Sequence, residues 1–226
     1  TNGKSEELPI PDNEREKADA MHKELIEVVA SNDEVLMEKY FDKGELDEDE
    51  MKMGMKKAMI NHDLFPVFCV SAERNMGSGR LMGFIDNVCP SANEMPAQTT
   101  KRGEKLPCDA NGPACIFIYK TVSEPHVGEL SFFKVYSGTI KSGMELENES
   151  TGVTEKISQL FLVEGNKRIN VNELVAGDIG ATLKLKNTHV NNTLHIKGKN
   201  YELNPIEFPP PNMTMAIETL KKGEEE

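Results

Sequence analysis

Residues 90–113 divide the chain into two parts with different hydrophobic periodicity. Before this segment, apolar residues recur at the spacing of amphipathic helices. After it, short runs rich in Ile, Phe, Tyr and Val alternate with Gly turns. The segment is punctuated by Pro and Gly and has no periodicity, so we expect a linker over residues 91–112. The sequence therefore predicts an α+β protein, with a helical and α/β first part followed by a small closed β-barrel.

The first part is expected to hold helices and one buried strand. The expected helices cover residues 13–30, 31–41, 47–59 and 78–88, and the expected strand covers residues 64–70. Ser31 and Glu34 have capping-box spacing, as do Asp47 and Glu50, so each pair predicts a helix start. The continuous apolar run at 64–70 is typical of a strand covered on both faces.

The second part is expected to be a barrel of short strands over residues 113–211. Its predicted strands cover residues 114–122, 129–136, 139–141, 144–148, 155–163, 178–185 and 193–196. The Pro run at 209–211 ends the barrel rigidly, because Pro cannot donate to a sheet. Residues 213–218 are expected to begin one further strand.

The formal net charge of the 226 residues is −12, which argues against a protein that coats nucleic acid by bulk charge. Residues 1–63 hold nine basic and eighteen acidic side chains, so most of the excess lies in the first part. The second part is nearly neutral and can still present a local basic loop. No apolar run reaches the length of a membrane helix.

Metal sites are not expected. The four cysteines form no C-x-x-C pair, which is typical of reduced thiols in a cytoplasmic protein. A calcium loop starting at Asp47 would need Gly at its sixth position and Glu at its twelfth, where the sequence has Lys52 and Ala58.

Motifs of catalysis are absent from the sequence as given. It has no G-x-x-x-x-G-K-[ST] phosphate loop and no G-x-S-x-G elbow, so no catalytic residue is assigned. Ser71-Ala72 ends the expected strand and would present free backbone N–H groups at a sheet edge, where open α/β folds bind ligands. On residue type alone, this is a weak indication of nucleotide binding.

Several motifs, in order, resemble bacterial elongation factor G or a divergent paralogue. Residues 111–138 (NGPACIFIYKTVSEPHVGELSFFKVYSG) resemble the opening of the family's second domain. Further resemblances lie at 36–40 (LMEKY), 66–67 (PV), 71–72 (SA), 166–168 (NKR), 175–179 (VAGDI), 207–211 (EFPPP) and 215–218 (MAIE). The similarity covers nearly the whole chain.

The resemblance implies a domain plan for an internal fragment. Residues 1–90 would be the C-terminal part of a P-loop GTPase domain with the end of its insert. Residues 91–112 would be the linker, 113–211 the barrel called domain II, and 212–226 the first strand of a truncated domain III. The phosphate loop and both switches would lie upstream of Thr1.

The resemblance also implies a function and site residues. The family is a GTPase, working with GTP and magnesium, that drives translocation on the ribosome. Ser71, Ala72 and Glu73 would be its last guanine-contacting element. Val70 stands where relatives usually have Gly. Because the phosphate-binding parts are missing, we expect this chain alone neither to hydrolyse GTP nor to bind it tightly.

The implied partners are the ribosome and its stalk protein, without membrane or DNA. Lys167 and Arg168 match the family's Asn-Lys-Arg loop and would meet phosphates of small-subunit ribosomal RNA, or would form a plain surface turn. Glu24 and Glu27 on the acidic first helix would touch a basic face of the stalk protein, or would form a solvated helix face.

Alternatives remain open at this point. Ribosome-protection proteins and release-factor-recycling GTPases share the same barrel, and a non-catalytic ribosome-binding module would need only the barrel and the acidic helix. The helical stretch 36–61 fits elongation factor G better than either related GTPase.

Overall fold

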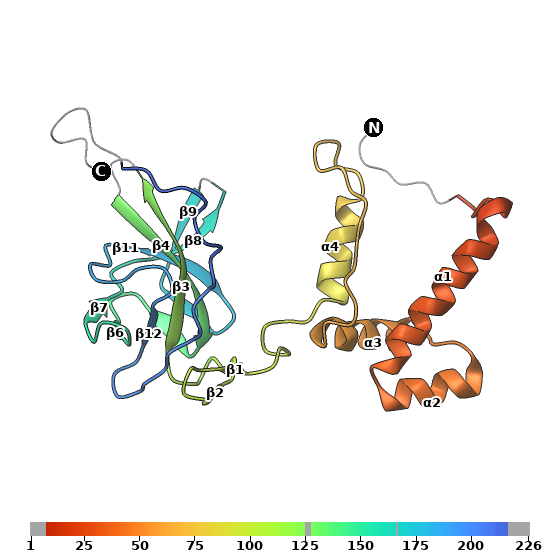
Figure 1. Ribbon diagram of the computed structural model, residues 1–226, viewed down its shortest axis with the longest axis horizontal. Helices are drawn as coiled ribbons and strands as arrows, with labels where there is room; N and C mark the ends of the chain where they lie inside the picture. The colour runs from red at the N-terminus through yellow and green to blue at the C-terminus, as the bar shows by residue number, and fades with distance from the viewer. Residues whose placement is uncertain (1–7, 125–127, 166, 217–226) are drawn as a thin grey trace. The chain divides into compact units, whose positions relative to one another are not determined.

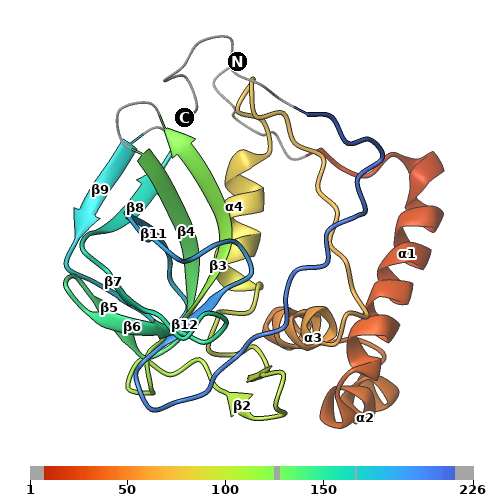
Figure 2. The same ribbon diagram turned by 60° about the vertical axis from the view of Figure 1, so that its left-hand side comes forward.

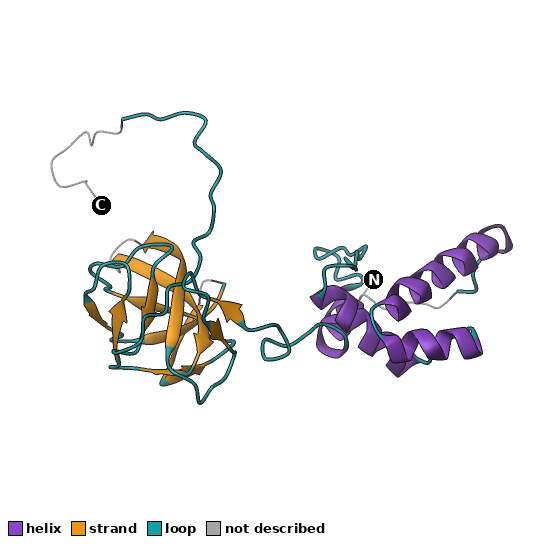
Figure 3. Ribbon diagram, turned by 60° about the horizontal axis from the view of Figure 1, so that its bottom comes forward, coloured by secondary structure: helices purple, strands orange, loops and turns teal. Residues whose placement is uncertain are grey.

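The computed structural model describes residues 8–124, 128–165 and 167–216 (Figure 1). The chain divides into two compact units, Thr1–Ser91 and Ala92–Glu226. The named helices lie in the first unit and the named strands in the second, as the secondary-structure colours of Figure 3 show. The fold thus combines helices with a large antiparallel sheet. Within the described ranges, no helix has the length and apolar content needed to cross a bilayer.

The first unit contains four helices close to the predicted positions. They are α1 (Asp12–Ser31), α2 (Glu34–Lys43), α3 (Glu48–Ile60) and α4 (Ser78–Asn87). The predicted capping box at the start of α3 is confirmed, with Asp47 accepting from backbone N–H groups and Glu50 bonding back to the Asp47 N–H. The predicted Ser31 cap is wrong. Asp33 caps α2 instead, because the Ser31 hydroxyl bonds back to the Val28 carbonyl and α1 continues through Ser31.

Helices α1, α2 and α3 pack through small and branched side chains. Val29, Leu36 and Ala58 are fully buried. Gly54 of α3 allows this approach, because a Cβ there would overlap Val29 Cγ1 and lie 2.8 Å from Leu36 Cδ1. Each of these helices therefore contributes to one small core, while some large apolar side chains, among them Met21, Val35 and Phe41, remain exposed.

The buried strand predicted at residues 64–70 is wrong for the described structure. No described segment pairs with it as a sheet, and Phe65 and Val67 are strongly exposed. The segment meets α4 through Phe68 and Phe84, whose ring centroids lie 4.8 Å apart. Apolar residues alone do not make a strand, since its backbone needs hydrogen-bonded neighbours.

The second unit is built on an eight-stranded antiparallel sheet in the order β7-β6-β12-β3-β4-β11-β8-β9. Its strands are β3 (Cys115–Glu124), β4 (Gly128–Ser137), β6 (Glu145–Asn148), β7 (Thr154–Lys156), β8 (Leu160–Glu164), β9 (Lys167–Val171), β11 (Ile179–Leu183) and β12 (Thr193–His195). A separate pair joins β5 (Thr139–Lys141) to β10 (Glu173–Val175). Figure 2 shows the strands curving around a common interior.

One hydrophobic cluster fills this interior. It contains side chains from both ends and from the middle of the sheet, among them Ile116, Leu146 and Leu160, together with Ile140 and Leu174 of the smaller pair. Strand β4 alternates buried and half-buried residues, the pattern of a strand with one face on a core. The expected barrel is therefore confirmed as a barrel-like antiparallel fold.

Some boundaries differ from the sequence prediction. The single strand expected over 155–163 is divided into β7 and β8, and β9 and β10 were not predicted. Both missed strands lie in the polar stretch that follows Gly165, where charged residues obscure the alternation. Of the strand expected at 213–218, residues 213–216 are not in a strand, and the remainder lies outside the described residues, as does most of the proposed domain III segment.

The segment expected as a linker is partly structured. Strands β1 (Gln98–Thr99) and β2 (Lys105–Leu106) pair as a short hairpin. Leu106 is 2% exposed and packs in a second cluster with Cys115, Phe117 and Leu203. This cluster lies outside the main core, so the hairpin covers part of the outer face of β3.

Candidate functional site

Ser71, Ala72 and Glu73 form the beginning of a tight turn. The Ser71 N–H donates to the Met76 carbonyl at 2.9 Å, and the Met76 N–H donates back to Ser71 at the same distance. Asn75, with a φ of 50°, closes the turn in the left-handed region. The expectation of a free N–H at Ser71 is therefore wrong, because this turn uses it. Ala72 and Glu73 are exposed.

The turn leads into α4 through Gly77. This residue has a φ of 75°, and a Cβ there would lie 3.1 Å from the Cys69 carbonyl oxygen. Only Gly combines that conformation with so close an approach to the preceding segment. The loop before α4 is thus fixed locally, and its residues 72–77 are exposed.

Lys167 and Arg168 lie at the start of β9, which pairs with β8. Lys167 is opposite Glu164 and Arg168 is opposite Val163, and both basic side chains are exposed. Successive residues of a strand point to opposite faces of the sheet. The structure therefore places both residues on one hairpin but directs them to different sides, so they do not form a two-residue clamp.

Glu24 and Glu27 are exposed on α1, one turn apart. Glu27 already has a partner, since its Oε1 accepts from the Tyr40 hydroxyl at 3.2 Å. Desolvation, and secondly this hydrogen bond, raise the pKa of Tyr40. Glu24 has the more open carboxylate of the two, while Glu27 also helps hold α1 against α2.

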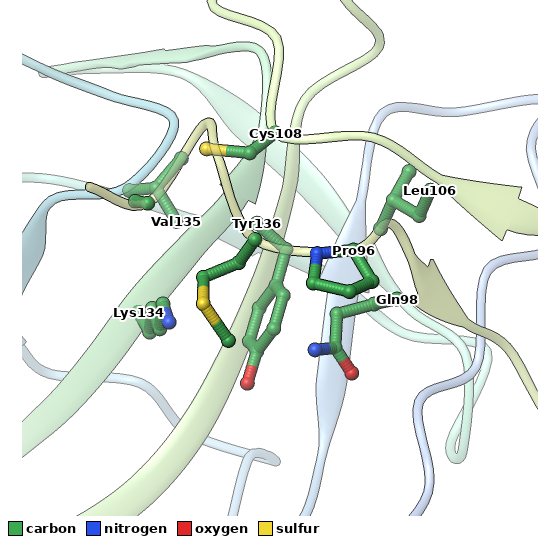
Figure 4. Close-up of a pocket in the computed structure, with 9 residues that line it drawn as sticks. Pro96, Gln98, Leu106, Cys108, Lys134, Val135 and Tyr136 are labelled. Carbon is green, nitrogen blue, oxygen red and sulfur yellow. The ribbon is translucent and has the colours of Figure 1, made fainter. Parts of the chain in front are cut away.

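A small pocket lies beside the β1–β2 hairpin in the second unit (Figure 4). Its volume is about 30 Å³, and its walls include Gln98, Cys108, Lys134 and Tyr136. The Lys134 ammonium lies 5.1 Å from the centre of the Tyr136 ring, a cation–π distance. Pockets for drug-sized ligands have volumes of about 300–1,000 Å³, so this pocket is too small for a nucleotide.

A larger polar groove lies between the turn of the β1–β2 hairpin and the loop after β12. Its volume is about 400 Å³. The lining residues are Arg102, Glu104, Lys105, Gly198, Lys199, Asn200 and Tyr201. Sequence reasoning missed this groove, although the basic runs at 101–105 (KRGEK) and 197–201 (KGKNY) were visible in the sequence. Their proximity depends on the fold, since nearly a hundred residues separate them.

No metal centre is evident in the part of the chain that the structure describes, since no group of three or more His, Cys, Asp or Glu side chains gathers there. Burial raises the pKa of the Cys115 thiol to about 12. These observations assign no catalytic chemistry to the described side chains.

Comparison with known proteins connects the second unit to a family. Residues 113–197 match the family model of elongation factor G domain 2. A solved structure of a protein from Thermus thermophilus is similar over 94% of this chain, with 26% sequence identity and a TM-score of 0.74. The chain spans 30% of the length of that protein.

The two comparisons cover different shares of the chain. The family match supports a translation elongation factor G-type domain over residues 113–197. The structural similarity extends beyond this domain, because a match to 94% of the chain must include helices of the first unit.

Proposed function

We propose that this chain is the middle portion of a translational GTPase of the elongation factor G type, which promotes translocation on the ribosome. The observation that carries the proposal is the match of residues 113–197 to the family's second domain. The first unit is proposed as the C-terminal part of the P-loop GTPase domain. The similarity to a much longer protein along nearly the whole chain supports this assignment.

The turn at Ser71, Ala72 and Glu73 is proposed as the last guanine-contacting element of that GTPase. The exposure of Ala72 and Glu73 supports this role, since a guanine oxygen requires N–H donors. Magnesium and the phosphates would be held by parts of the GTPase outside these residues. We therefore propose that this chain alone has little affinity for GTP, and binding of a fluorescent GDP analogue tests that statement.

Ribosomal RNA is the proposed partner of the barrel-like unit, and Lys167 and Arg168 are its proposed phosphate contacts. Their exposure on the β8–β9 hairpin supports the role. Because they point to opposite faces, we expect one of the two to dominate. Glu24 and Glu27 are proposed to meet a basic face of the ribosomal stalk protein, with Glu24 the more available of the pair.

A non-catalytic ribosome-binding module is the second candidate. The match to the family's second domain supports it as well, because residues 113–197 lie outside the part proposed as the GTPase domain. A ribosome-protection or release-factor-recycling GTPase would share the barrel. Binding of GTP by a longer form of the protein would separate either GTPase from the module.

Co-sedimentation with 70S ribosomes tests the proposed function. The wild-type chain should pellet with ribosomes, and Lys167→Ala or Arg168→Ala should reduce the pelleted fraction and flatten its salt dependence by about one unit of slope. Lys156→Ala is the matched control, since Lys156 is an exposed strand lysine elsewhere on the unit. Failure of the wild type to pellet would contradict ribosome docking. Unchanged pelleting of both variants would contradict the proposed RNA contact of the β8–β9 hairpin and would leave ribosome docking itself untouched.

A further inference from the structure

We propose that the polar groove between the turn at residues 100–103 and the loop at residues 197–201 binds the phosphodiester backbone of RNA. The choice of RNA among polyanions rests on the ribosomal role proposed above. The site itself is inferred from the contacts and charges that follow, and none of the residues assigned from sequence contributes to it.

The two walls of the groove are fastened to each other. The Lys101 N–H donates to the Glu202 carbonyl at 2.7 Å, and the Lys101 ammonium lies 2.5 Å from the Glu202 carboxylate. Leu106 and Leu203, which follow the two walls along the chain, are buried in one hydrophobic cluster. The groove is therefore a fixed feature of the second unit and does not depend on a loose loop.

The lining of the groove carries more positive than negative charge, although Arg102 is paired with Glu149. Its lining holds three cations, Arg102, Lys105 and Lys199, against one carboxylate, Glu104. The chain as a whole carries a net charge of −12. Most of that excess lies in residues 1–63, and the second unit is nearly neutral, so a local basic groove on it can determine where a polyanion binds. Phosphate oxygens are the usual acceptors for Arg and Lys in nucleic-acid interfaces.

The Arg102 guanidinium is held in place by hydrogen bonds to two neighbouring side chains. Its Nη2 donates to Glu149 at 2.7 Å, and with the Asn200 amide oxygen turned toward it, its Nη1 donates to Asn200 at 3.2 Å. The Arg102 side chain remains 52% exposed. A guanidinium carries five N–H donors, so these two contacts leave others for a phosphate. Fixing the side chain in advance lowers the entropy lost on binding.

Lys105 and Lys199 are held by neutral partners. The Lys105 ammonium donates to the Thr99 hydroxyl at 2.8 Å, and the Lys199 ammonium lies 6.0 Å from the centre of the Tyr201 ring. Among the described residues, neither lysine forms an ion pair. Their charges are therefore not cancelled by a carboxylate, and each is positioned to meet a phosphate by displacing only water.

Fluorescence anisotropy with a labelled twelve-nucleotide oligouridylate tests the groove. The wild-type chain should bind at low salt. Lys105→Ala/Lys199→Ala should bind at least about ten-fold more weakly, and its salt dependence should flatten by about 1.4 units of slope, the value for two phosphate contacts on a single strand. Arg102 is left intact, because its loss would leave Glu149 without a cation. Both lysines are exposed, so the fold should persist in the double variant, and circular dichroism checks it.

Lys141→Ala/Lys156→Ala is the matched control, because it removes two exposed strand lysines of the same unit and changes the net charge equally. It should bind the oligouridylate as the wild type does. Wild-type affinity in Lys105→Ala/Lys199→Ala, or no binding by the wild type at low salt, would overturn the proposal. Equal competition by polyglutamate of the same charge would overturn the assignment to RNA.

These results are separable from ribosome pelleting. If the chain pellets with ribosomes but does not bind the oligouridylate, the groove proposal is contradicted and the proposed ribosomal role is supported. If the chain binds the oligouridylate through Lys105 and Lys199 but does not pellet, the groove proposal is supported and the proposed ribosomal role is contradicted.

Discussion

The buried imidazole of His195 lies between two hydrogen-bond acceptors, and one of them is Glu149. Its Nε2 is 2.9 Å from the Glu149 carboxylate, and its Nδ1 is 3.0 Å from the Ile196 carbonyl. A carbonyl oxygen only accepts, so Nδ1 must donate to it, and one proton must then lie between Nε2 and the Glu149 carboxylate, carried by either group. The second Glu149 oxygen is bonded to Arg102. His195 and Arg102 thus share one carboxylate behind the groove.

We expect His195→Gln to lower the free energy of unfolding by about 1–3 kcal/mol, because the change disturbs polar groups with almost no access to water. Urea denaturation measures the effect. His189→Gln is the control, since that histidine is exposed, and should change stability by less than about 0.5 kcal/mol. In a double-mutant cycle with Glu149→Gln, additive losses would contradict a direct His195–Glu149 interaction.

Gly54→Ala should destabilise the first unit by about 1–3 kcal/mol, although Ala normally favours a helix over Gly. The added methyl would overlap Val29 and press on Leu36, both fully buried. Gly83→Ala in α4 is the matched change, because its Cβ would meet no atom within 4 Å. It should stabilise by about 0.5–1 kcal/mol. Thermal unfolding that ranks the two variants the other way would refute the packing described here.

The cysteines should react at very different rates with N-ethylmaleimide in the folded protein. Cys69 is exposed, whereas Cys115 is buried and its pKa is raised to about 12. Near neutral pH almost no thiolate forms at Cys115, so it should be labelled only after unfolding. Peptide mapping by mass spectrometry follows each site. Labelling of native Cys115 as fast as Cys69 would show that the β3 face is open.

Acid should weaken the packing of the first unit. Hydrogen bonds from Lys57 and Lys39 are the main causes that lower the pKa of Asp33 and of Glu50 below 3.8 and 4.5. A carboxylate with a lowered folded-state pKa stabilises the fold above its unfolded value, and the contribution is lost as the pH falls through the folded value. We therefore expect the urea concentration at the midpoint of unfolding to decrease as the pH is lowered below about 4. Asp33→Asn/Glu50→Gln should flatten that part of the profile, and an unaltered profile would exclude these pairs as its source.

Helix starts and core faces could be predicted from the sequence because they depend on local patterns. The capping residues at Asp47 and the alternation of apolar residues in β4 act over a few positions, and both predictions are confirmed. The choice of Asp33 over Ser31 required knowing where α1 ends. The strand expected at 64–70 failed for a non-local reason, since strand formation depends on neighbours that no pattern within the segment specifies.

The candidate site shows the same division. The exposure of Lys167 and Glu24 follows from local amphipathicity. The hydrogen bond from the Ser71 N–H to the Met76 carbonyl belongs to a turn, which leaves no hydrophobic pattern in the sequence by which it could be predicted. The groove at Arg102 and Lys199 could not be found from spacing, because its walls come together only when Lys101 meets Glu202.

The fastening of Lys101 to Glu202 has a mechanical consequence. These residues lie where the chain approaches and leaves the strands β3 to β12, so the two ends of that region are side by side. A pulling force applied through the flanking chain would act first on the contact between Lys101 and Glu202, before it reached the hydrogen bonds between the strands. The strands between the two residues would thus be spared a force that acts along the flanking chain.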